Sequence, residues 1–294
     1  MMDYGWRTVV IQSPSRLTIK DGQMSVYDVP AEEEHLIPIE EIRRVIVSVP
    51  SGFVSFHLLQ RLIEANVSVV LCDRKHIPSG EITPIGIREE SSGCIIDQTC
   101  WTQERKDTLW KEIVVQKITN QIGVLEKCDK EIPTVLVEYL NNVESGDPTN
   151  REAMAAKVYF HALFGMNFGR HSNDIRNTAL NYGYALLSST AARTVSMHGY
   201  HNALGIHHHS RNNKLNLACD IMEPFRPFVD LVVSKNGKRR LDNTFKLELI
   251  SIMQNECFVD GRRISIEDGV ELYGLNMLRA LGDGRIKAPE VRLE

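Results

Sequence analysis

The sequence predicts an α+β protein in which a small N-terminal β-rich domain is followed by a larger all-α domain. Two observations support this prediction. Short apolar or alternating runs separated by turn-forming residues occupy the first part of the chain, as is typical of strands. Beyond about residue 100, apolar residues recur at the spacing of one helix face. The chain of 294 residues is 43% hydrophobic and 24% charged, which is the composition of an ordinary globular protein.

The N-terminal part contains six candidate strands and one candidate helix. Asp21-Gly22 separates two of the strands and has the composition of a tight hairpin turn. Within Ser55–Ala65 the apolar residues fall on one helical stripe. The expected strands are Thr8–Ile11, Leu17–Lys20, Gln23–Tyr27, His35–Ile39, Ile42–Val49 and Val67–Leu71.

A polar, glycine-bearing stretch begins at Arg88 and has the composition of a linker. We therefore expect an N-terminal domain over residues 1–87, a linker over 88–99 and a helical domain over 100–294. Gly199 follows the long expected helix Asn173–His198 and is a plausible left-handed residue at its end. The expected helices are Trp101–Glu126, Ile132–Val143, Asn173–His198, Phe245–Glu256 and Glu267–Leu281.

Several protein classes are excluded or disfavoured. No apolar run reaches the roughly 18 residues that a membrane span needs, and Met1–Gly5 does not begin a secretory signal. We expect a cytoplasmic protein with no membrane partner. The six cysteines form no CxxC pair, which argues against a zinc ribbon. The segments GxxxxGK[ST], GxGxxG and GxSxG are absent, which argues against the corresponding nucleotide-binding and hydrolase families.

The first segment that carries chemistry surrounds Glu152. Thr149 and Glu152 have the spacing of a capping box, in which the glutamate bonds back to the backbone at the start of a helix. Alternatively, the small side chains of Ala153, Ala155 and Ala156 allow close approach of another segment, so that the Glu152 carboxylate faces a partly enclosed cleft. Both interpretations remain open at this stage.

The second segment contains His207, His208 and His209. Consecutive side chains point in different directions on any regular backbone, so they cannot all bind one metal ion. A surface loop explains them equally simply. Imidazole is nevertheless a common metal ligand and a proton shuttle near neutral pH.

The third segment contains Asp220 and Glu223, which share a face if they lie on one helical turn. Two adjacent carboxylates repel each other unless a cation or a proton lies between them. The alternative is that they favour the positive N-terminal end of a helix. With Glu152 and one histidine they form a donor set suited to Mg²⁺ or Mn²⁺, and the imidazole favours manganese.

Basic residues form two groups, Arg211 with Lys214 and a run from Lys235 to Arg240. A solvated surface explains such a run, and contact with phosphate groups is the alternative. Because the formal net charge is −4, any binding of nucleic acid must depend on local patches of this kind.

Three stretches resemble the CRISPR-associated integrase family Cas1 in its type II form, in consistent order over nearly the whole chain. They are Arg151–Phe160, Asn181–Tyr184 and above all Asp220–Asp230, and Gly5–Ile11 is also similar to that subfamily. The resemblance implies an N-terminal domain that forms homodimers and a helical catalytic domain. It also implies assembly with Cas2, a small ferredoxin-like partner, and binding of double-stranded DNA, both the incoming fragment (prespacer) and the CRISPR repeat.

The resemblance further implies that Glu152, His208 and Glu223 are the catalytic metal ligands, with Mg²⁺ or Mn²⁺ as cofactor and Asp220 as an auxiliary acid. His207 and His209 are the alternative choices for the histidine ligand. The implied reaction joins the 3′-hydroxyl ends of short DNA fragments to a CRISPR repeat by transesterification, with an additional endonuclease activity. Expected DNA contacts are Arg211 and Lys214, followed by Lys238, Arg239 and Arg240. The alternatives are a metal-dependent nuclease that only hydrolyses DNA and a non-catalytic DNA-binding scaffold.

Overall fold

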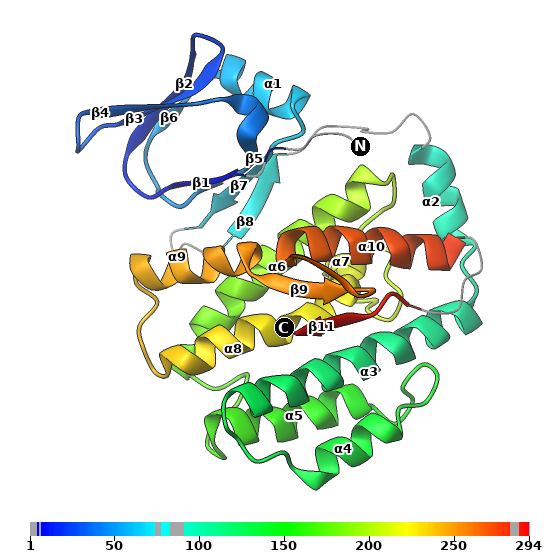
Figure 1. Ribbon diagram of the computed structural model, residues 1–294. Coiled ribbons are helices and arrows are strands. Elements are labelled where there is room, and N and C mark those ends of the chain that lie inside the picture. The colour runs from blue at the N-terminus through cyan, green and yellow to red at the C-terminus, as the bar shows by residue number, and fades with distance from the viewer. Residues whose placement is uncertain (1–4, 6, 74–77, 83–90, 283–287, 294) are drawn as a thin grey trace. The chain divides into compact units, whose positions relative to one another are not determined.

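The computed structural model describes residues 5, 7–73, 78–82, 91–282 and 288–293. The chain divides into two compact units, Met1–Gly86 and Ile87–Glu294. The first unit is built mainly of strands and the second mainly of helices (Figure 1). The predicted α+β class, with a β-rich N-terminal part before a larger helical part, is therefore confirmed.

Two four-stranded sheets form the N-terminal unit, with strand orders β1-β5-β7-β8 and β4-β3-β2-β6. In the first sheet β5 pairs in parallel with both β1 and β7, and β8 is antiparallel to β7. The strands are β1 (Arg7–Ile11), β2 (Ser15–Lys20), β3 (Gln23–Asp28), β4 (Glu33–Ile37), β5 (Ile42–Val47), β6 (Phe53–Val54), β7 (Ser68–Cys72) and β8 (Pro78–Ile82). A short 3₁₀ helix, η1 (Ile39–Glu41), precedes β5, and helix α1 (Phe56–Glu64) precedes β7.

Local sequence explains two features of this unit. Asp21 and Gly22 both have positive φ, 52° and 76°, as the two-residue turn between β2 and β3 requires. The Ser55 side chain accepts a hydrogen bond from the Leu58 backbone N–H at 3.2 Å and so caps the start of α1.

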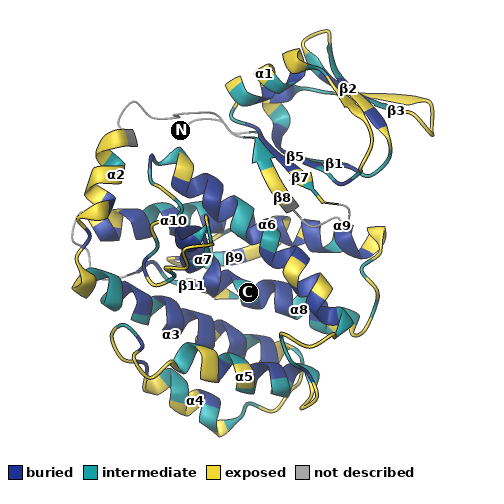
Figure 2. Cartoon of the chain, turned by 180° about the vertical axis from the view of Figure 1, so that it is seen from behind, coloured by how far each residue is buried: buried dark blue, intermediate teal, exposed yellow. Residues whose placement is uncertain are grey.

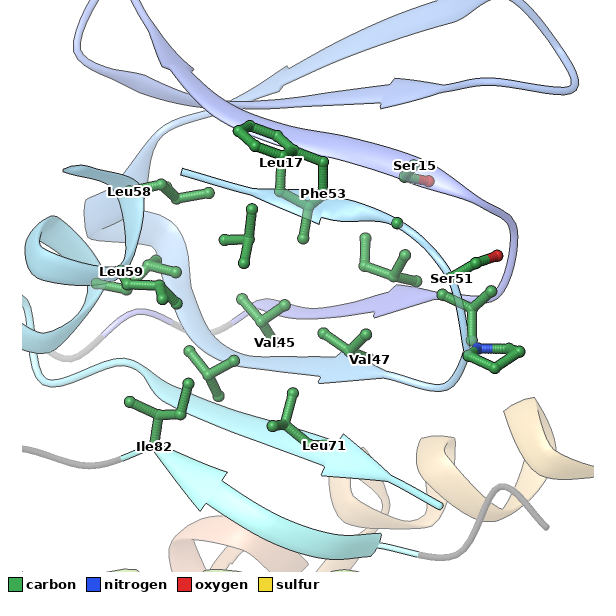
Figure 3. A pocket seen from close by; sticks show the side chains of 17 residues that line it. Ser15, Leu17, Val45, Val47, Ser51, Phe53, Leu58, Leu59, Leu71 and Ile82 are labelled. Carbon is green, nitrogen blue, oxygen red and sulfur yellow. The ribbon is translucent and has the colours of Figure 1, made fainter. Parts of the chain in front are cut away.

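An apolar cavity of about 270 Å³ lies among the strands of the N-terminal unit (Figure 3). Leu17 on β2, Val45 on β5 and Leu58 on α1 line it, together with Phe53 on β6. Leu17, Val45 and Leu58 are buried, whereas Phe53 is 58% exposed. The unit therefore leaves part of its apolar interior accessible.

Helices dominate the C-terminal unit, and α3 contacts α4, α5 and α8 (Figure 1). Both α3 and α6 are buried along much of their length (Figure 2). The helices are α2 (Ser91–Thr99), α3 (Gln103–Lys127), α4 (Thr134–Asn141), α5 (Arg151–Phe164), α6 (Ile175–Met197), α7 (Asn216–Met222), α8 (Arg226–Asn236), α9 (Asn243–Ser251) and α10 (Ile266–Gly282), with 3₁₀ helices η2 (Glu223–Phe225) and η3 (Ile252–Gln254).

Three of the differences between the structure and the sequence predictions lie in the C-terminal unit. The C-terminal unit is not all helical, because β9 (Glu256–Val259) pairs with β10 (Arg262–Ser265) and β11 (Val291–Leu293) in a small sheet. The helix expected to reach Glu256 ends earlier, since Glu256 already starts β9. Residues 91–99 of the expected linker form α2, and residues 88–90 lie outside the described part of the chain.

Close packing of α6 against α8 depends on a glycine. A Cβ atom added at Gly183 would lie 2.4 Å from Val229 Cγ1, so only glycine lets the two helices approach this closely. Both residues belong to the stretches that resemble the Cas1 family. Among the described residues, no helix is long and apolar enough to cross a membrane.

Candidate metal and DNA site

Helix α5 places Glu152 in its first turn. Asn150 precedes the helix in the left-handed conformation, with φ 54° and ψ 44°. The buried Asp147 carboxylate caps the helix, because it accepts hydrogen bonds from the backbone N–H groups of Arg151 at 2.8 Å and Glu152 at 2.9 Å. The capping-box interpretation of Thr149 and Glu152 is therefore wrong, and the Glu152 side chain is free for contacts elsewhere.

Asp220 and Glu223 lie on consecutive elements. Asp220 is in α7, Glu223 is the first residue of η2, and α8 follows directly at Arg226. Both carboxylates are buried, with residue exposures of 0% for Asp220 and 2% for Glu223. Neither residue starts a long helix, so stabilisation of a helix N-terminus does not account for the pair.

Asp220 organises the histidine loop. Its Oδ2 accepts hydrogen bonds from the backbone N–H groups of Ile206 at 2.6 Å and His207 at 3.2 Å, and its Oδ1 accepts one from the N–H of His208 at 3.1 Å. The ring Nδ1 of His208 lies 2.7 Å from Oδ1. A Cβ atom at Gly205 would lie 2.2 Å from the carbonyl oxygen of His208, so the loop turns tightly enough to need glycine there. Asp220 is thus a positioning residue for His208.

The three histidines have different surroundings. The His207 ring stacks on Trp110 of α3, with centroids 4.2 Å apart and planes inclined by 1°. Burial lowers the pKa of His207. His209 is exposed, and its Nδ1 contacts the His207 carbonyl oxygen at 2.8 Å.

His208 is the member of the run that faces the acidic residues. Burial lowers its pKa, but the hydrogen bond and charge of Asp220 outweigh this effect, and the charge of Glu223 adds to them, so the net shift is upward. Since the ring interacts electrostatically with both Asp220 and Glu223, these contacts favour His208 over its neighbours as the functional histidine. The choice among the three stays a prediction.

Lys117 of α3 joins Glu152 and Glu223. Its Nζ forms ion pairs with Glu152 Oε1 and with Glu223 Oε2, the second at 2.5 Å. The Lys117 side chain is only 7% exposed. Burial lowers its pKa, but the charges of Glu152 and Glu223 outweigh burial and raise it overall, so the group is an ammonium ion. Sequence reasoning did not identify this residue as part of the site.

Arg226 contacts the other oxygen of Glu223. Its guanidinium lies 2.8 Å from Glu223 Oε1, so each oxygen of this buried carboxylate has a cationic partner. Burial raises the pKa of Glu223, but the charges of Arg226 and Lys117 outweigh burial, and the net shift is downward. Glu223 is therefore ionised inside the protein.

Asp230 is a further buried acid, and Tyr184 links it to Arg226. The guanidinium of Arg226 lies over the Tyr184 ring, 4.8 Å from its centre, and the Tyr184 hydroxyl donates a hydrogen bond to Asp230 Oδ1. The Tyr159 hydroxyl donates to Asp230 Oδ2 at 3.1 Å. Burial raises the pKa of Asp230 to about 6, against the lowering by the two tyrosine hydrogen bonds. Tyr184, which is held by its hydrogen bond to Asp230, packs against Arg226, and Arg226 in turn contacts Glu223.

The candidate metal ligands have suitable donor atoms but do not form a metal-ligand cluster among the described residues. Glu152, Glu223 and His208 offer the oxygen and imidazole donors that suit Mg²⁺ or Mn²⁺. In the part of the chain that the structure describes, no three His, Cys, Asp or Glu side chains are grouped to hold a metal ion. The Lys117 ammonium already lies between the two carboxylates, which shows that this space accommodates positive charge.

The predicted DNA-binding residues fall into two classes. Arg211 and Lys214 are exposed in the loop that follows His208, and Lys238 and Arg240 are among the residues after α8. Arg239 differs, because it pairs with Glu248 at 2.8 Å and Asp242 at 3.0 Å and lies over the Phe245 ring. Its contacts are those of a residue that stabilises the start of α9.

Comparison with known proteins identifies the family. Residues 8–250 match the family described as CRISPR associated protein Cas1. The CRISPR-associated endonuclease Cas1 of Neisseria meningitidis serogroup C (strain 8013) is 36% identical over 97% of this chain and 96% of the relative. The chain belongs to the Cas1 family. This confirms the resemblance stated from the sequence motifs.

Solved structures share the fold of this Cas1-family chain. A casposase bound to an integration product has a TM-score of 0.80 at 19% identity and covers 96% of this chain and 92% of its own. A Cas6-RT-Cas1–Cas2 complex contains a chain with a TM-score of 0.74 at 16% identity, covering 99% of this chain and 36% of that longer chain. At these identities the likeness concerns the fold alone.

Proposed function

We propose that this Cas1-family chain is a divalent-metal-dependent DNA endonuclease and integrase, which joins the 3′-hydroxyl ends of short DNA fragments to the repeat of a CRISPR array. The observation that carries the proposal is the convergence of Glu152 and Glu223, far apart in the sequence, on the ammonium of Lys117, with His208 close enough to Glu223 for their charges to interact. The Neisseria relative is named an endonuclease, and the casposase of similar fold is bound to an integration product, and both support the same chemistry.

Glu152, Glu223 and His208 are the residues proposed to hold Mg²⁺ or Mn²⁺. When bound, the ion supplies Lewis-acid stabilisation of the charge that accumulates on the reacting phosphate. Asp220 holds the His208 loop through backbone hydrogen bonds and occupies Nδ1 of the ring, so Nε2 is the nitrogen proposed to face the ion or the attacking hydroxyl. Fixing the second ring nitrogen in this way orients the imidazole before substrate arrives.

The protein contributes alignment and charge rather than a covalent intermediate. In transesterification, the 3′-hydroxyl oxygen attacks a backbone phosphate at the repeat boundary, a new phosphodiester bond forms, and the other 3′-oxygen leaves. His208 is placed to accept the hydroxyl proton if it is not itself a ligand. Arg226 keeps Glu223 ionised and correctly oriented through contact with Oε1.

The DNA partners proposed for this chain are a double-stranded prespacer and the CRISPR repeat. Arg211 and Lys214 follow His208 closely in the sequence, so they are the first candidates for phosphate contacts. Lys238 and Arg240 are second. Arg239 is proposed to act mainly through its contacts with Asp242 and Glu248 rather than with DNA.

The proposed protein partners are a second copy of the chain and Cas2. One of the structures of similar fold is a Cas6-RT-Cas1–Cas2 complex, which supports the Cas2 proposal. For the homodimer, the support is in the N-terminal unit, where Phe56 is 90% exposed and Phe53 is 58% exposed at the apolar cavity (Figure 3). Exposed apolar groups of this kind are typical of protein interfaces.

The test supplies linear DNA with free 3′-hydroxyl ends, a supercoiled plasmid that carries the repeat, the purified chain with Cas2, and Mg²⁺ or Mn²⁺. Covalent joining that requires the ion and is lost in Glu152→Gln and Glu223→Gln supports the proposal. Nicking without joining supports a nuclease that only hydrolyses DNA. If Glu152→Ala changes no measurable activity while loss of Arg211 and Lys214 weakens DNA binding, the chain is a DNA-binding scaffold.

A further inference from the structure

Lys117 makes contacts that a purely structural lysine would not need. It lies in the middle of α3, and its side chain is 7% exposed. Nζ contacts Glu152 Oε1 from α5 and Glu223 Oε2 from η2, so the ammonium joins two acids that are 71 positions apart in the sequence. These are the oxygens that a metal ion held by Glu152 and Glu223 would take.

We infer that Lys117 is an exchangeable counter-charge of this site: its ammonium neutralises Glu152 and Glu223 when no divalent ion is bound and is displaced when the ion enters. The inference rests on the proposed function only in assigning these two carboxylates to the ion. It assigns to Lys117 the role of setting how tightly the ion binds.

Charge and geometry support displacement over coexistence. An ammonium group and a divalent ion cannot both contact the same two oxygens, because like charges at contact distance repel strongly away from bulk water. Arg226 does not compete in this way, since it contacts Oε1 of Glu223 and leaves Oε2 to Lys117. The lysine stem is flexible, so the ammonium moves without any shift of α3.

The same contacts explain why no metal-ligand cluster is preformed among the described residues. Glu152 and Glu223 face the ammonium from different elements, and Nζ contacts one oxygen of each carboxylate. Without the Lys117 ammonium, two buried or half-buried carboxylates would face and repel one another. The binding of another cation would then be more favourable in free energy. A divalent ion is the natural replacement.

The experiment measures Mn²⁺ binding to the full-length protein by electron paramagnetic resonance of the free ion, without DNA. Lys117→Met keeps the approximate length of the side chain and removes its charge. We expect it to bind Mn²⁺ about tenfold more tightly than the unsubstituted protein, which corresponds to about 1.4 kcal/mol. Lys127→Met is the matched control, because Lys127 is exposed in the last turn of the same helix. It should bind Mn²⁺ with unchanged affinity.

Unchanged or weaker Mn²⁺ binding by Lys117→Met would overturn the inference, because it would mean that the ammonium supports the ligands rather than competing for them. If Lys117→Met does not fold without the ion, a crystal structure of the unsubstituted protein with Mn²⁺ decides the question. Lys117 Nζ must then have left at least one of Glu152 and Glu223, and retention of both contacts beside the bound ion contradicts the exchange. Failure of the proposed function is a different result, in which the unsubstituted protein binds no Mn²⁺ or Glu223→Gln binds it equally well.

Discussion

Replacement of Asp220 by asparagine tests how the histidine loop is held. The Asp220 carboxylate is fully buried and accepts backbone hydrogen bonds from Ile206, His207 and His208, in addition to its contact with Nδ1 of His208. Asparagine has nearly the same shape, but one of its two polar atoms is an NH₂ donor. The NH₂ group of asparagine would then face backbone N–H groups of the histidine loop, which are themselves donors.

The expected cost follows from these contacts. Each hydrogen bond to a charged group contributes about 1.5–3 kcal/mol, and a buried donor without a partner costs about 1–3 kcal/mol. Because one oxygen remains, we expect Asp220→Asn to lower the free energy of unfolding by about 2–4 kcal/mol. The substitution should also lower the pKa of His208, since Asp220 contributes more than Glu223 to raising it against the effect of burial.

The sign of the pH dependence provides a further check. Because the pKa of His208 is raised in the folded protein, its interaction with Asp220 contributes stability that is complete below the pKa of the unfolded chain and is lost as pH rises through the folded value. The difference in stability between the unsubstituted protein and Asp220→Asn should therefore be larger at about pH 6 than at about pH 9.

Denaturant unfolding measures the stability, histidine NMR titration measures the pKa, and hydrogen exchange measures protection of the amides at 206–208. A loss of stability below about 0.5 kcal/mol, with unchanged protection of these amides, would refute the reasoning, because it would show that the buried carboxylate does not hold the loop. Loss of Mn²⁺ binding with a stable, well-protected loop would instead mean that Asp220 itself contacts the ion.

Three further predictions concern other parts of the site. Gly205→Ala should destabilise the protein by about 1–3 kcal/mol and loosen the same loop in hydrogen exchange, because the new Cβ atom would lie 2.2 Å from a backbone oxygen. Burial raises the pKa of Asp230 to about 6, so its protonated form contributes about 3 kcal/mol to the free energy of unfolding, which is complete below about pH 4 and is lost as pH rises through 6. Asp230→Asn should remove this pH dependence from the free energy of unfolding, and an unchanged pH dependence contradicts the assignment. The double substitution of Arg211 and Lys214 by alanine should weaken binding of double-stranded DNA and reduce its salt slope by about 2 in fluorescence anisotropy, whereas Arg239→Ala should chiefly lower stability.

The periodicity of apolar residues predicted the long helices well, because the pattern that signals such a helix lies entirely within its own segment. The helix expected at Trp101–Glu126 is α3, Gln103–Lys127, and the one expected at Asn173–His198 is α6, Ile175–Met197. The small C-terminal sheet was missed in two parts. β11 pairs with β9 across a long stretch of intervening chain, and no local pattern signals that pairing. The β9–β10 hairpin did carry a local signal, because Asp260-Gly261 joins the two strands with positive φ, as Asp21-Gly22 does between β2 and β3.

For the site, sequence reasoning proposed Glu152, His208 and Glu223 through residue type and resemblance, and the structure brings the two glutamates to one ammonium group. The capping-box interpretation failed because the Asp147 carboxylate, and not the Thr149 hydroxyl, accepts the hydrogen bonds at the start of α5. Asp147 has positive φ and lies in the turn before the helix. A local spacing rule cannot anticipate a competing acceptor from a neighbouring turn.

Lys117 was missed although the sequence carries a signal for it. Leu109, Ile113 and Lys117 are spaced four residues apart, so a lysine occupies the apolar stripe of a long helix. Leu109 and Ile113 are both fully buried in the structure. A buried lysine is almost always paired with an acid, so the stripe predicts a carboxylate partner in the core. It does not say which acids, because these come from α5 and η2.

The charges at the site are better explained by function than by stability. Taking ion pairs out of water costs free energy that apolar side chains of similar volume would not, so buried pairs are a weak source of stability. Asp220 has donors on both oxygens and would keep them with an ion bound, which makes its role architectural. Lys117 is different, because both of its acidic partners are proposed metal ligands, and bound metal would take at least one of them from it. Burial of Glu152 and Glu223 around the Lys117 ammonium carries a desolvation cost. The same arrangement leaves both carboxylates available to a divalent ion once the ammonium moves away, and this distinguishes Lys117 from the other cations of the site.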